Sequence, residues 1–346
     1  MKISSPEHKI RLALLLAGGG ARCRRHLSDC EMERDVLEFL KTDHRLKRLC
    51  TKVSEMDDQE VDRILDQVRE QGWRWIVPAD KEYPELLTET ADPPLGLFVR
   101  GRLDENPRVA VVGSRKATSY GREVTRLFAA DMARMGIVLV SGMARGIDQE
   151  AHQSVITHGG RTFAVWGAGP DRIYPAEHRD LAEKIAANGA LITEYPPGTP
   201  PRKHHFPERN RLIAGLSSAV VVVEAAVRSG ALVTARLAIE EGRDVLAVPG
   251  SILSEMSVGP NALIRMGARP LLTARDIAEV IGIDPQEPGD APVEDETALL
   301  GRLEVLTVDE ITARSDLDLP LVLSRLLELE LAGDVEQMPD GRYRRC

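Results

Sequence analysis

VAVVGSRKATSYG, residues 109–121, opens the part of the chain that decides the fold. It begins with a short β-branched run that ends at Gly113, and a helical pattern follows. The same alternation recurs along the chain, with apolar runs at VAVVG (109–113), IVLVSG (137–142), TFAVWG (162–167), ALITEY (190–195), AVVVVEA (219–225) and DVLAVPG (244–250), and a last short strand near residue 270. Strands that alternate with helices predict βαβ units and a parallel sheet. Because the strands are almost wholly apolar, both faces of the sheet should be covered. We therefore predict an α/β, doubly wound, mostly parallel, Rossmann-like domain.

The residues before this domain have a helical pattern of apolar residues. Val61, Ile64, Leu65 and Val68 have the spacing of one helical face, and Gly72 is suited to end that helix. Residues 1–75 are therefore predicted to form a small helical (SAM-like) domain. Residues 76–107 are rich in proline and are predicted to be an extended connector with one short strand, so the Rossmann-like domain with its entry connector spans 76–282.

The residues after the Rossmann-like domain form a linker and a further small domain. IDPQEPGDAPVEDET (283–297) is acidic and rich in proline, as linkers often are. Residues 298–346 are predicted to form helices near 298–304, 307–314 and 319–332, then a hairpin with Asp340-Gly341 at its turn. This arrangement resembles a winged helix. From Glu304 to Glu336 the chain has nine acidic and two basic residues, so contact with protein or a structural use is favoured over DNA reading.

The overall composition limits the class of protein. A net charge of −9 and a pI near 5.5 argue against a general nucleic-acid coat, although one focused basic groove remains compatible with them. Cys23, Cys30, Cys50 and Cys346 form no CxxC pair, which favours free thiols in a reducing cytosol. The apolar run at 12–17 is too short for a signal peptide, and no run approaches the ~18–20 residues of a membrane span. We expect a soluble, cytoplasmic protein.

The most basic loop of the predicted domain is RKHHFPERNR, residues 202–211, with three more positive than negative charges. Pro207 suits the first position of a helix, so we predict that Arg209, Asn210 and Arg211 fill its first turn, where free backbone N–H groups favour anions. Cations, an amide and one ring, Phe206, suit a phosphate chain that carries a base. A solvated basic loop would show the same composition, and the position of the loop in the fold decides between them.

The loop should lie at the ligand-binding edge of the sheet. In doubly wound folds, ligands bind beyond the carboxyl ends of the parallel strands. The loop follows the strand at 190–195, so it projects from that edge. The other residues there are mostly small or charged: Gly113-Ser114-Arg115, Ser141-Gly142, Gly167, Glu194, Glu224 and Gly250. This placement favours a binding site, with Arg115 directed at an anion.

Several familiar chemistries do not match this edge. The first turn reads GSRKAT and not GxGxxG, the second strand ends without a carboxylate for a ribose, and the chain contains no GxxxxGK[ST], so NAD and P-loop sites are unsupported. His204-His205 and the Asp148/His152 pair have no convincing third metal ligand, and Asp148 is explained more simply as a cap or first-turn acid. We predict no cofactor and no metal.

A glycosidic-bond hydrolase is the alternative that we keep. The nucleotide-hydrolysing family once labelled lysine decarboxylases, the nucleotide phosphoribohydrolases, has a similar sheet and a PGGxGTxxE loop. The matching region here, 229–237, keeps one glycine and Thr234 but has Leu237 where the acid should be. The sequence therefore indicates a shared fold with the catalytic chemistry lost.

The motifs together closely resemble the DNA-processing protein A family (DprA, also called Smf). The stretches that carry the resemblance are VAVVGSRKATSYG, SGMARGIDQEAH, IYPAEHRDL, LITEYPPGTPPRKHHFPERNRLIAGLS, VVVEAAVRSGALVTARLAIEEGRDVLAVPG and GPNALIRMGA. The match covers about residues 80–282 almost continuously. The N-terminal region is similar to that family's helical domain only weakly, and the C-terminal region is similar to its winged-helix tail.

The resemblance implies a bacterial cytoplasmic protein that binds single-stranded DNA without cutting it and is not an enzyme. It further implies protection of incoming DNA in natural transformation, loading of the recombinase RecA, and a homodimer formed through the Rossmann-like domain. By motif position, the family's DNA pocket falls on Arg115, Gly142, Arg145, Lys203, Phe206, Arg209, Asn210 and Arg211. Gly142 and Arg145 rest mainly on the resemblance, whereas the composition and position of the loop indicate the others independently.

The sequence also suggests where a dimer would form. The segment from Gly259 to Val280 places Leu263, Ile264, Met266 and Leu271 near the last strand of the sheet. A terminal strand exposes an edge that can pair with a second copy. We therefore expect a two-fold dimer in this region, with ordinary core packing of the same residues as the alternative.

Overall fold

The computed structural model describes residues 6–17, 51–53, 55–283, 307–314, 319–332, 335–338 and 341–345. The four cysteines, the predicted helix at 298–304 and the predicted linker at 283–297, apart from Ile283, lie outside these residues. The chain divides into two compact units, Met1–Pro285 and Gln286–Cys346. We describe each unit by itself.

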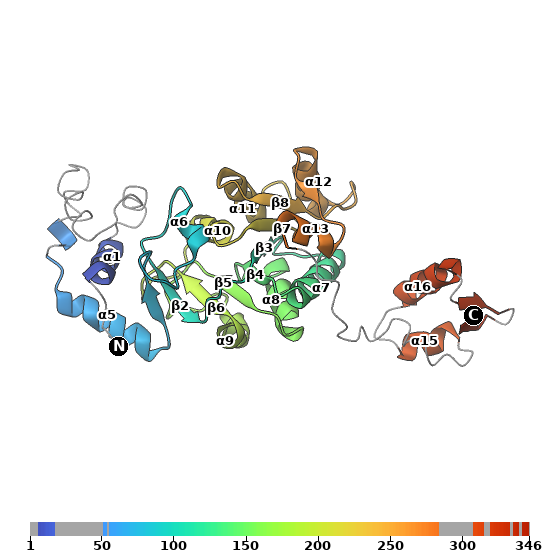
Figure 1. The fold of residues 1–346 in the computed structure, drawn as a ribbon, viewed down its shortest axis with the longest axis horizontal. Helices are drawn as coiled ribbons and strands as arrows, with labels where there is room; N and C mark the ends of the chain where they lie inside the picture. The colour runs from blue at the N-terminus through green and yellow to red at the C-terminus, as the bar shows by residue number, and fades with distance from the viewer. Residues whose placement is uncertain are drawn as a thin grey trace. The chain divides into compact units, whose positions relative to one another are not determined.

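The first unit is built around one nine-stranded sheet with the strand order β1-β2-β6-β5-β4-β3-β7-β8-β9 (Figure 1). The strands are β1 (Arg74–Ile76), β2 (Leu97–Gly101), β3 (Arg108–Val112), β4 (Val138–Ser141), β5 (Thr162–Val165), β6 (Ala190–Thr193), β7 (Ala219–Val222), β8 (Asp244–Ala247) and β9 (Arg269–Pro270). Strands β3 to β9 are all parallel, whereas β1 and β2 add to the β6 side as antiparallel strands. The predicted mostly parallel, doubly wound sheet is thus confirmed.

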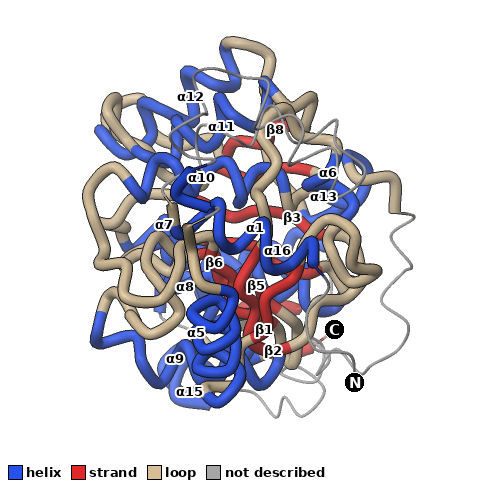
Figure 2. The backbone as a smooth tube through the Cα atoms, turned by 90° about the vertical axis from the view of Figure 1, so that its left-hand side faces the viewer, coloured by secondary structure: helices blue, strands red, loops and turns tan. Residues whose placement is uncertain are grey.

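Helices cover both faces of this sheet, as the strand composition predicted (Figure 2). The helices are α1 (Pro6–Leu16), α5 (Asp58–Glu70), α6 (Glu85–Thr88), α7 (Ser119–Arg134), α8 (Ile147–Thr157), α9 (Arg179–Asn188), α10 (His205–Gly215), α11 (Gly230–Glu240), α12 (Val258–Arg265) and α13 (Ala274–Val280). Helices α10, α11 and α12 pack on one face, and α7, α8 and α13 on the other. The strand residues between the two layers are buried, since successive side chains of a strand point to opposite faces.

The order of the strands creates the crevice in which the site lies. From β3 the chain moves outward through β4, β5 and β6, and it then returns to the other side of β3 with β7 and β8. The helix after β3, α7, and the helix after β7, α11, pack on opposite faces of the sheet. The loops that leave these two neighbouring strands therefore diverge, which is the usual place for a ligand in a doubly wound sheet.

The N-terminal helices pack against the β1 side of the sheet. Leu12 of α1 and Val61 and Leu65 of α5 share a buried cluster with Trp75 and Phe98. Helix α5 carries the predicted apolar face, and the chain turns at Gly72, whose φ is +78°. Because this cluster is continuous with the sheet, the predicted domain division at residue 75 stays a prediction. The prediction that residues 1–75 are helical missed strand β1, which begins at the end of that range. Three residues are too few to show an alternating pattern.

The second unit contains α15 (Val308–Arg314), α16 (Leu319–Ala332) and an antiparallel hairpin of β10 (Val335–Gln337) and β11 (Tyr343–Arg345). Ile311, Val322, Leu326, Val335 and Tyr343 form its buried cluster. Gly341 has φ +81° and closes the predicted hairpin turn. Two of the three predicted helices and the hairpin are thus present among the described residues. Among those residues, no helix in either unit is long and apolar enough to cross a membrane.

Candidate nucleic-acid interface

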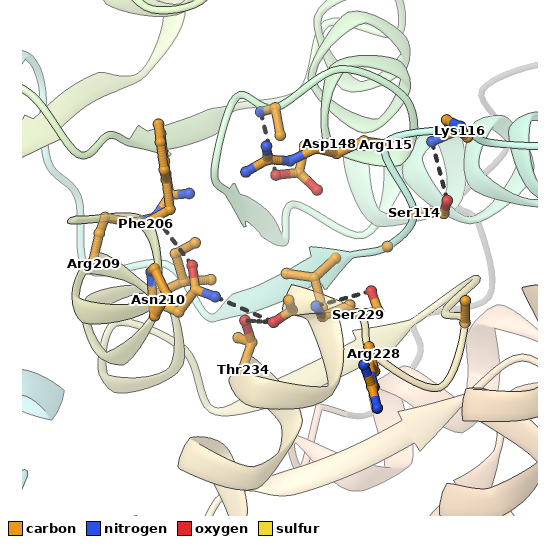
Figure 3. Close-up of a pocket in the computed structure, with 18 of the residues that line it drawn as sticks. Ser114, Arg115, Lys116, Asp148, Phe206, Arg209, Asn210, Arg228, Ser229 and Thr234 are labelled. Atoms are coloured by element: carbon orange, nitrogen blue, oxygen red, sulfur yellow. Dashed lines mark hydrogen bonds between the residues drawn. The ribbon is translucent and has the colours of Figure 1, made fainter. Parts of the chain in front are cut away.

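A pocket of about 670 Å³ lies beyond the carboxyl ends of the parallel strands (Figure 3). The turn after β3 supplies Ser114, Arg115 and Lys116, and helix α10 with its preceding loop supplies Lys203, Phe206, Arg209 and Asn210. The loop after β7 and the start of α11 supply Arg228, Ser229, Gly230 and Thr234. A smaller cavity of about 30 Å³ adjoins it, because Arg115, Ala144, Tyr174, Phe206 and Arg209 line both. Gly142 and Arg145 line only this smaller cavity.

The exposed cations of the pocket come from three loops. Arg115, Lys116, Lys203 and Arg228 are all exposed, and each sits on a loop at the same sheet edge. Since the loops follow different strands, the charges are brought together only by the fold. Their sum is positive, whereas Asp148, the one carboxylate that lines the pocket among the described residues, is buried beneath it. The arrangement suits an anion with several charges along its length.

Phe206 lies directly beneath one of these cations. The guanidinium carbon of Arg115 is 5.2 Å from the centroid of the Phe206 ring, a cation–π contact. Phe206 is partly buried in the first turn of α10. Tyr174, from the loop between β5 and α9, has its ring centroid 5.5 Å from that of Phe206 at an interplanar angle of 40°. Only Phe206 was predicted from the sequence, because nothing in the chain order shows that Tyr174 reaches it.

Arg209 lies under the pocket as an anchor and not on its surface. Its guanidinium donates to the backbone carbonyl of Gly142 at 2.8 Å and to that of Val165, so it joins the ends of β4 and β5. Burial lowers the pKa of Arg209 to about 10, which leaves the group protonated at neutral pH, and the Asp148 carboxylate acts in the opposite direction. Arg209 therefore contributes a buried positive charge close to the pocket.

Gly142 holds this anchor by its backbone. Its N–H donates to Asp148 at 3.2 Å, and its carbonyl accepts from Arg209. A Cβ at this position would lie 2.7 Å from an Arg209 nitrogen and 2.8 Å from an Asp148 oxygen, so any larger residue would have to displace one of these side chains. Asp148 lies in the first turn of α8, as predicted for a first-turn acid, and it also accepts from the N–H of Ala144 before the helix. The predicted site residue Gly142 thus shapes the floor of the site.

Two expectations about helix α10 were wrong. The helix begins at His205, so Pro207 is its third residue and not its first. Arg209 and Asn210 accordingly fall in the second turn and are only 5% and 8% exposed. Asn210 donates to the carbonyl of Gly230 at 3.2 Å and accepts from Arg209, and it thereby links α10 to α11.

Arg211 lines neither cavity. Each residue turns a helix by 100°, so Arg211 points about 200° away from Arg209. Its guanidinium pairs with the buried carboxylate of Glu194 and donates to the backbone carbonyl of Asp92. The predicted residue is therefore part of a structural ion pair. The same ion pair engages the carboxylate of Glu194, the residue that follows β6, and Glu194 lines neither cavity.

Arg145 stands at the mouth of the smaller cavity. Its side chain is exposed, and its Nε donates to Glu177 at 2.6 Å. The pKa of Glu177 is lowered first by its own backbone N–H and then by the bond from Arg145. A phosphate that reached Arg145 would have to compete with this carboxylate. Among the residues that the structure describes, no group of three His, Cys, Asp or Glu side chains could hold a metal ion.

The fold and the site define a Rossmann-like protein with a cationic, ring-bearing pocket at the switch point of its sheet. Residues 74–282 match the family model described as DNA recombination-mediator protein A, and residues 284–341 match the DprA winged helix domain. The chain belongs to the DNA recombination-mediator protein A family, DprA or Smf.

Relatives and solved structures agree with this assignment. Protein Smf of Escherichia coli (strain K12) is 41% identical over 293 residues, which are 80% of this chain and 78% of that protein. The X-ray structure of DprA from Streptococcus pneumoniae superposes with a TM-score of 0.69 at 34% identity, over 81% of this chain and 98% of that one. DprA of Helicobacter pylori, whose structure was described for its single-stranded DNA binding mode, has a TM-score of 0.53 at 28% identity, over 59% and 94%.

Proposed function

We propose that this protein binds single-stranded DNA without catalysing a reaction on it, and that it acts as a recombination mediator. The observation that carries the proposal is the pocket in which exposed cations from three loops, Arg115, Lys116, Lys203 and Arg228, lie around the neighbouring rings of Phe206 and Tyr174. Cations along a groove neutralise phosphates, and aromatic rings stack with unpaired bases. The described binding of single strands by the H. pylori relative supports the same ligand.

Among the residues that the structure describes, Asp148 is the carboxylate that lines the pocket, and it is not available as the acid of a nucleotide-hydrolysing enzyme. Asp148 accepts two backbone N–H bonds beneath the floor and lies beside Arg209, so it is committed to the structure. Leu237, which stands where the related hydrolases carry their acid, packs against the hydrophobic core behind α11. Gly230 and Thr234 of the same region do line the pocket, which supports a shared binding site with the reaction lost.

One titration separates the two functions. The full chain is mixed with oligo(dT), with a duplex of equal length and with mononucleotides, and base release is assayed in the same samples. We expect tight binding of the single strand, weaker binding of the duplex and no released base. Equal affinity for the duplex and the single strand would contradict the proposal. Turnover of a nucleotide would establish the enzyme in its place.

We further propose that the protein protects incoming DNA in natural transformation and helps to load RecA, in the cytoplasm. This part rests on the family alone. Its test is the rate at which RecA assembles on a strand that the protein has bound first, compared with the naked strand. A lower rate than on the naked strand would argue for a storage role without loading.

We also propose a homodimer formed through the Rossmann-like domain. The pairing of two sheet edges that the sequence suggested is not favoured by the structure, however. The edge strand β9 has only two residues, and Pro270 has no N–H to offer, so pairing of two edges would gain little. Leu263 and Leu271 are buried in the core, whereas Met266 and Leu272 are 77% and 66% exposed. Side-chain contact through Met266 and Leu272 is therefore the dimer surface that we propose. Light scattering at micromolar concentration tests it, and Met266→Lys should shift a dimer to monomer.

The second unit is proposed to contact protein and not DNA. Residues 286–346 contain 15 acidic and six basic residues, a balance of −9 that equals the net charge of the whole chain. Residues 1–285 are therefore neutral overall, and the repulsion of phosphates comes from the second unit. Deletion of residues 286–346 should leave the affinity for short single strands equal or higher.

A further inference from the structure

We propose that Tyr174 is a second base-stacking residue of the pocket and forms one platform with Phe206. This inference rests on the proposed binding of single-stranded DNA. Tyr174 lies on the loop after β5 and Phe206 lies in the first turn of α10 after β6, and the centroids of the two rings are 5.5 Å apart. Tyr174 lines both the main pocket and the smaller cavity. The platform therefore spans the place where the two cavities meet.

Tyr174 offers the more open ring of the two. It is 41% exposed, whereas Phe206 is partly buried and has the Arg115 guanidinium over its ring. A base that stacked on the covered face of Phe206 would have to displace Arg115 or lie on the guanidinium. No such group stands in front of Tyr174 among the described residues. An exposed aromatic ring beside cations is the arrangement that sequence-tolerant single-strand sites use.

The loop that carries Tyr174 is fixed on both sides. Before it, the N–H of Gly169 donates to the carbonyl of Thr199 at 2.9 Å. After it, buried His178 donates from Nδ1 to the carbonyl of Met143 at 3.1 Å. These bonds tie the loop to the segments that follow β6 and β4. Little conformational freedom is thus left to lose when a base arrives, which favours binding.

The structure gives no competing use for the side chain. Among the described residues the Tyr174 hydroxyl has no hydrogen-bond partner, and the ring does not belong to the hydrophobic core. Tyr174→Phe should therefore preserve both the fold and the stacking surface. Tyr174→Leu keeps an apolar side chain of similar size but removes the ring face, and this pair of variants isolates stacking from mere bulk.

The test compares two labelled probes of equal length and charge, oligo(dT) and an abasic deoxyribose-phosphate strand, on the full chain. We expect Tyr174→Leu to weaken oligo(dT) binding by about 5- to 150-fold and to leave abasic binding unchanged. Tyr174→Phe should match the wild type on both probes. Unchanged oligo(dT) affinity in Tyr174→Leu overturns the inference, as do equal losses on both probes. If the wild type does not bind oligo(dT) at all, the proposed function fails with it.

A second measurement on the wild type does not depend on any variant. A strand that carries 5-iodouracil is bound and irradiated, and the crosslinked peptides are identified by mass spectrometry. We expect crosslinks at Tyr174 as well as at Phe206. Crosslinks confined to the peptide of Phe206 would show that only one ring meets bases, and the two-ring platform would be abandoned.

Discussion

The Arg115 guanidinium carbon lies 5.2 Å from the centroid of the Phe206 ring, so the cation and the ring of this pocket form one group. Arg115 belongs to the turn after β3, and Phe206 belongs to α10 after β6. A charge stacked on a ring is held in place before a ligand arrives, with an energy of about 0.5–2 kcal/mol for such contacts. Substitutions at the two positions should nevertheless be separable, because only one of them carries charge.

Removal of a pocket cation should change the salt dependence of binding. Each of the variants Arg115→Ala and Lys203→Ala should have a shallower slope of log affinity against log salt for oligo(dT). The expected change is ~0.7, the contribution of one phosphate contact on a single strand. Arg115→Lys is the matched control, since it should keep the slope but bind more weakly without a planar face. An unchanged slope in Arg115→Ala would remove Arg115 from the phosphate path.

Phe206→Leu should lower affinity without altering the salt slope. The substitution removes a stacking surface worth ~1–3 kcal/mol per base but removes no charge. Affinities measured by fluorescence anisotropy at four salt concentrations provide both numbers. If the unfolding temperature of Phe206→Leu is lower than that of the wild type by more than a few degrees, the ring also stabilises the first turn of α10. A slope that flattens as much as in Arg115→Ala would contradict the division of roles.

Arg211→Met should act on stability and not on binding. It removes the guanidinium that pairs with buried Glu194, and breaking a buried ion pair typically costs about 3–5 kcal/mol in the free energy of unfolding. Arg228→Ala is the opposite case, because that exposed pocket side chain should leave stability within about 0.5 kcal/mol and flatten the salt slope. Urea unfolding and salt titration of both variants check the pair. A flattened salt slope in folded Arg211→Met would return Arg211 to the interface.

Gly142→Ala should damage the floor of the pocket. The added methyl would meet Arg209 and Asp148 at under 3 Å, and overpacking of this kind costs about 1–3 kcal/mol. Gly230→Ala serves as the control, since a Cβ there has no heavy atom within 4 Å and the residue opens helix α11. We expect lower stability only in the first variant, together with weaker oligo(dT) binding in that variant because the Arg209 anchor is displaced. Equal behaviour of the two variants would show that the Arg209 anchor tolerates displacement.

His152 should make the protein less stable in mild acid. Burial, followed by the charges of His178 and Arg209, lowers the pKa of His152 from 6.5 to about 3. The Thr162 hydroxyl donates to the carbonyl of Leu139, so it accepts from Nδ1–H of His152, and Nε2 is buried without a partner among the described residues. The folded protein therefore holds a neutral imidazole.

The direction of the pH effect follows from where each state binds the proton. Above pH 6.5 neither state is protonated at His152, and its contribution to stability is complete. As the pH falls from 6.5 towards 3, only the unfolded state takes up the proton, so stability drops by about 2 kcal/mol by pH 5. His152→Phe should lose this part of the slope in urea unfolding at pH 7 and pH 5. An unchanged pH dependence in that variant would contradict the assignment.

The sequence by itself determined the order of the elements and the edge of the sheet where the site lies. Apolar runs such as VAVVG at 109–113 can be buried on both faces only in a covered parallel sheet, so the doubly wound fold follows from local composition. Loops after successive parallel strands share one edge, so Arg115, Lys203 and Phe206 could be placed together. The motifs were dense enough to show the family, which the comparisons confirm.

Only the tertiary structure decided which side chains line the pocket. Arg209, Asn210 and Arg211 are adjacent in the sequence and were predicted to share one role. In the structure, Arg209 anchors two strands and Asn210 links two helices, whereas Arg211 pairs with Glu194. The difference depends on a helix start two residues earlier than predicted and on a rotation of 100° per residue. Tyr174 lies 32 positions before Phe206, and their contact exists because β5 and β6 are neighbours in the sheet. Contacts of this kind depend on which strands pair in the sheet, and a local pattern of residues does not predict that pairing.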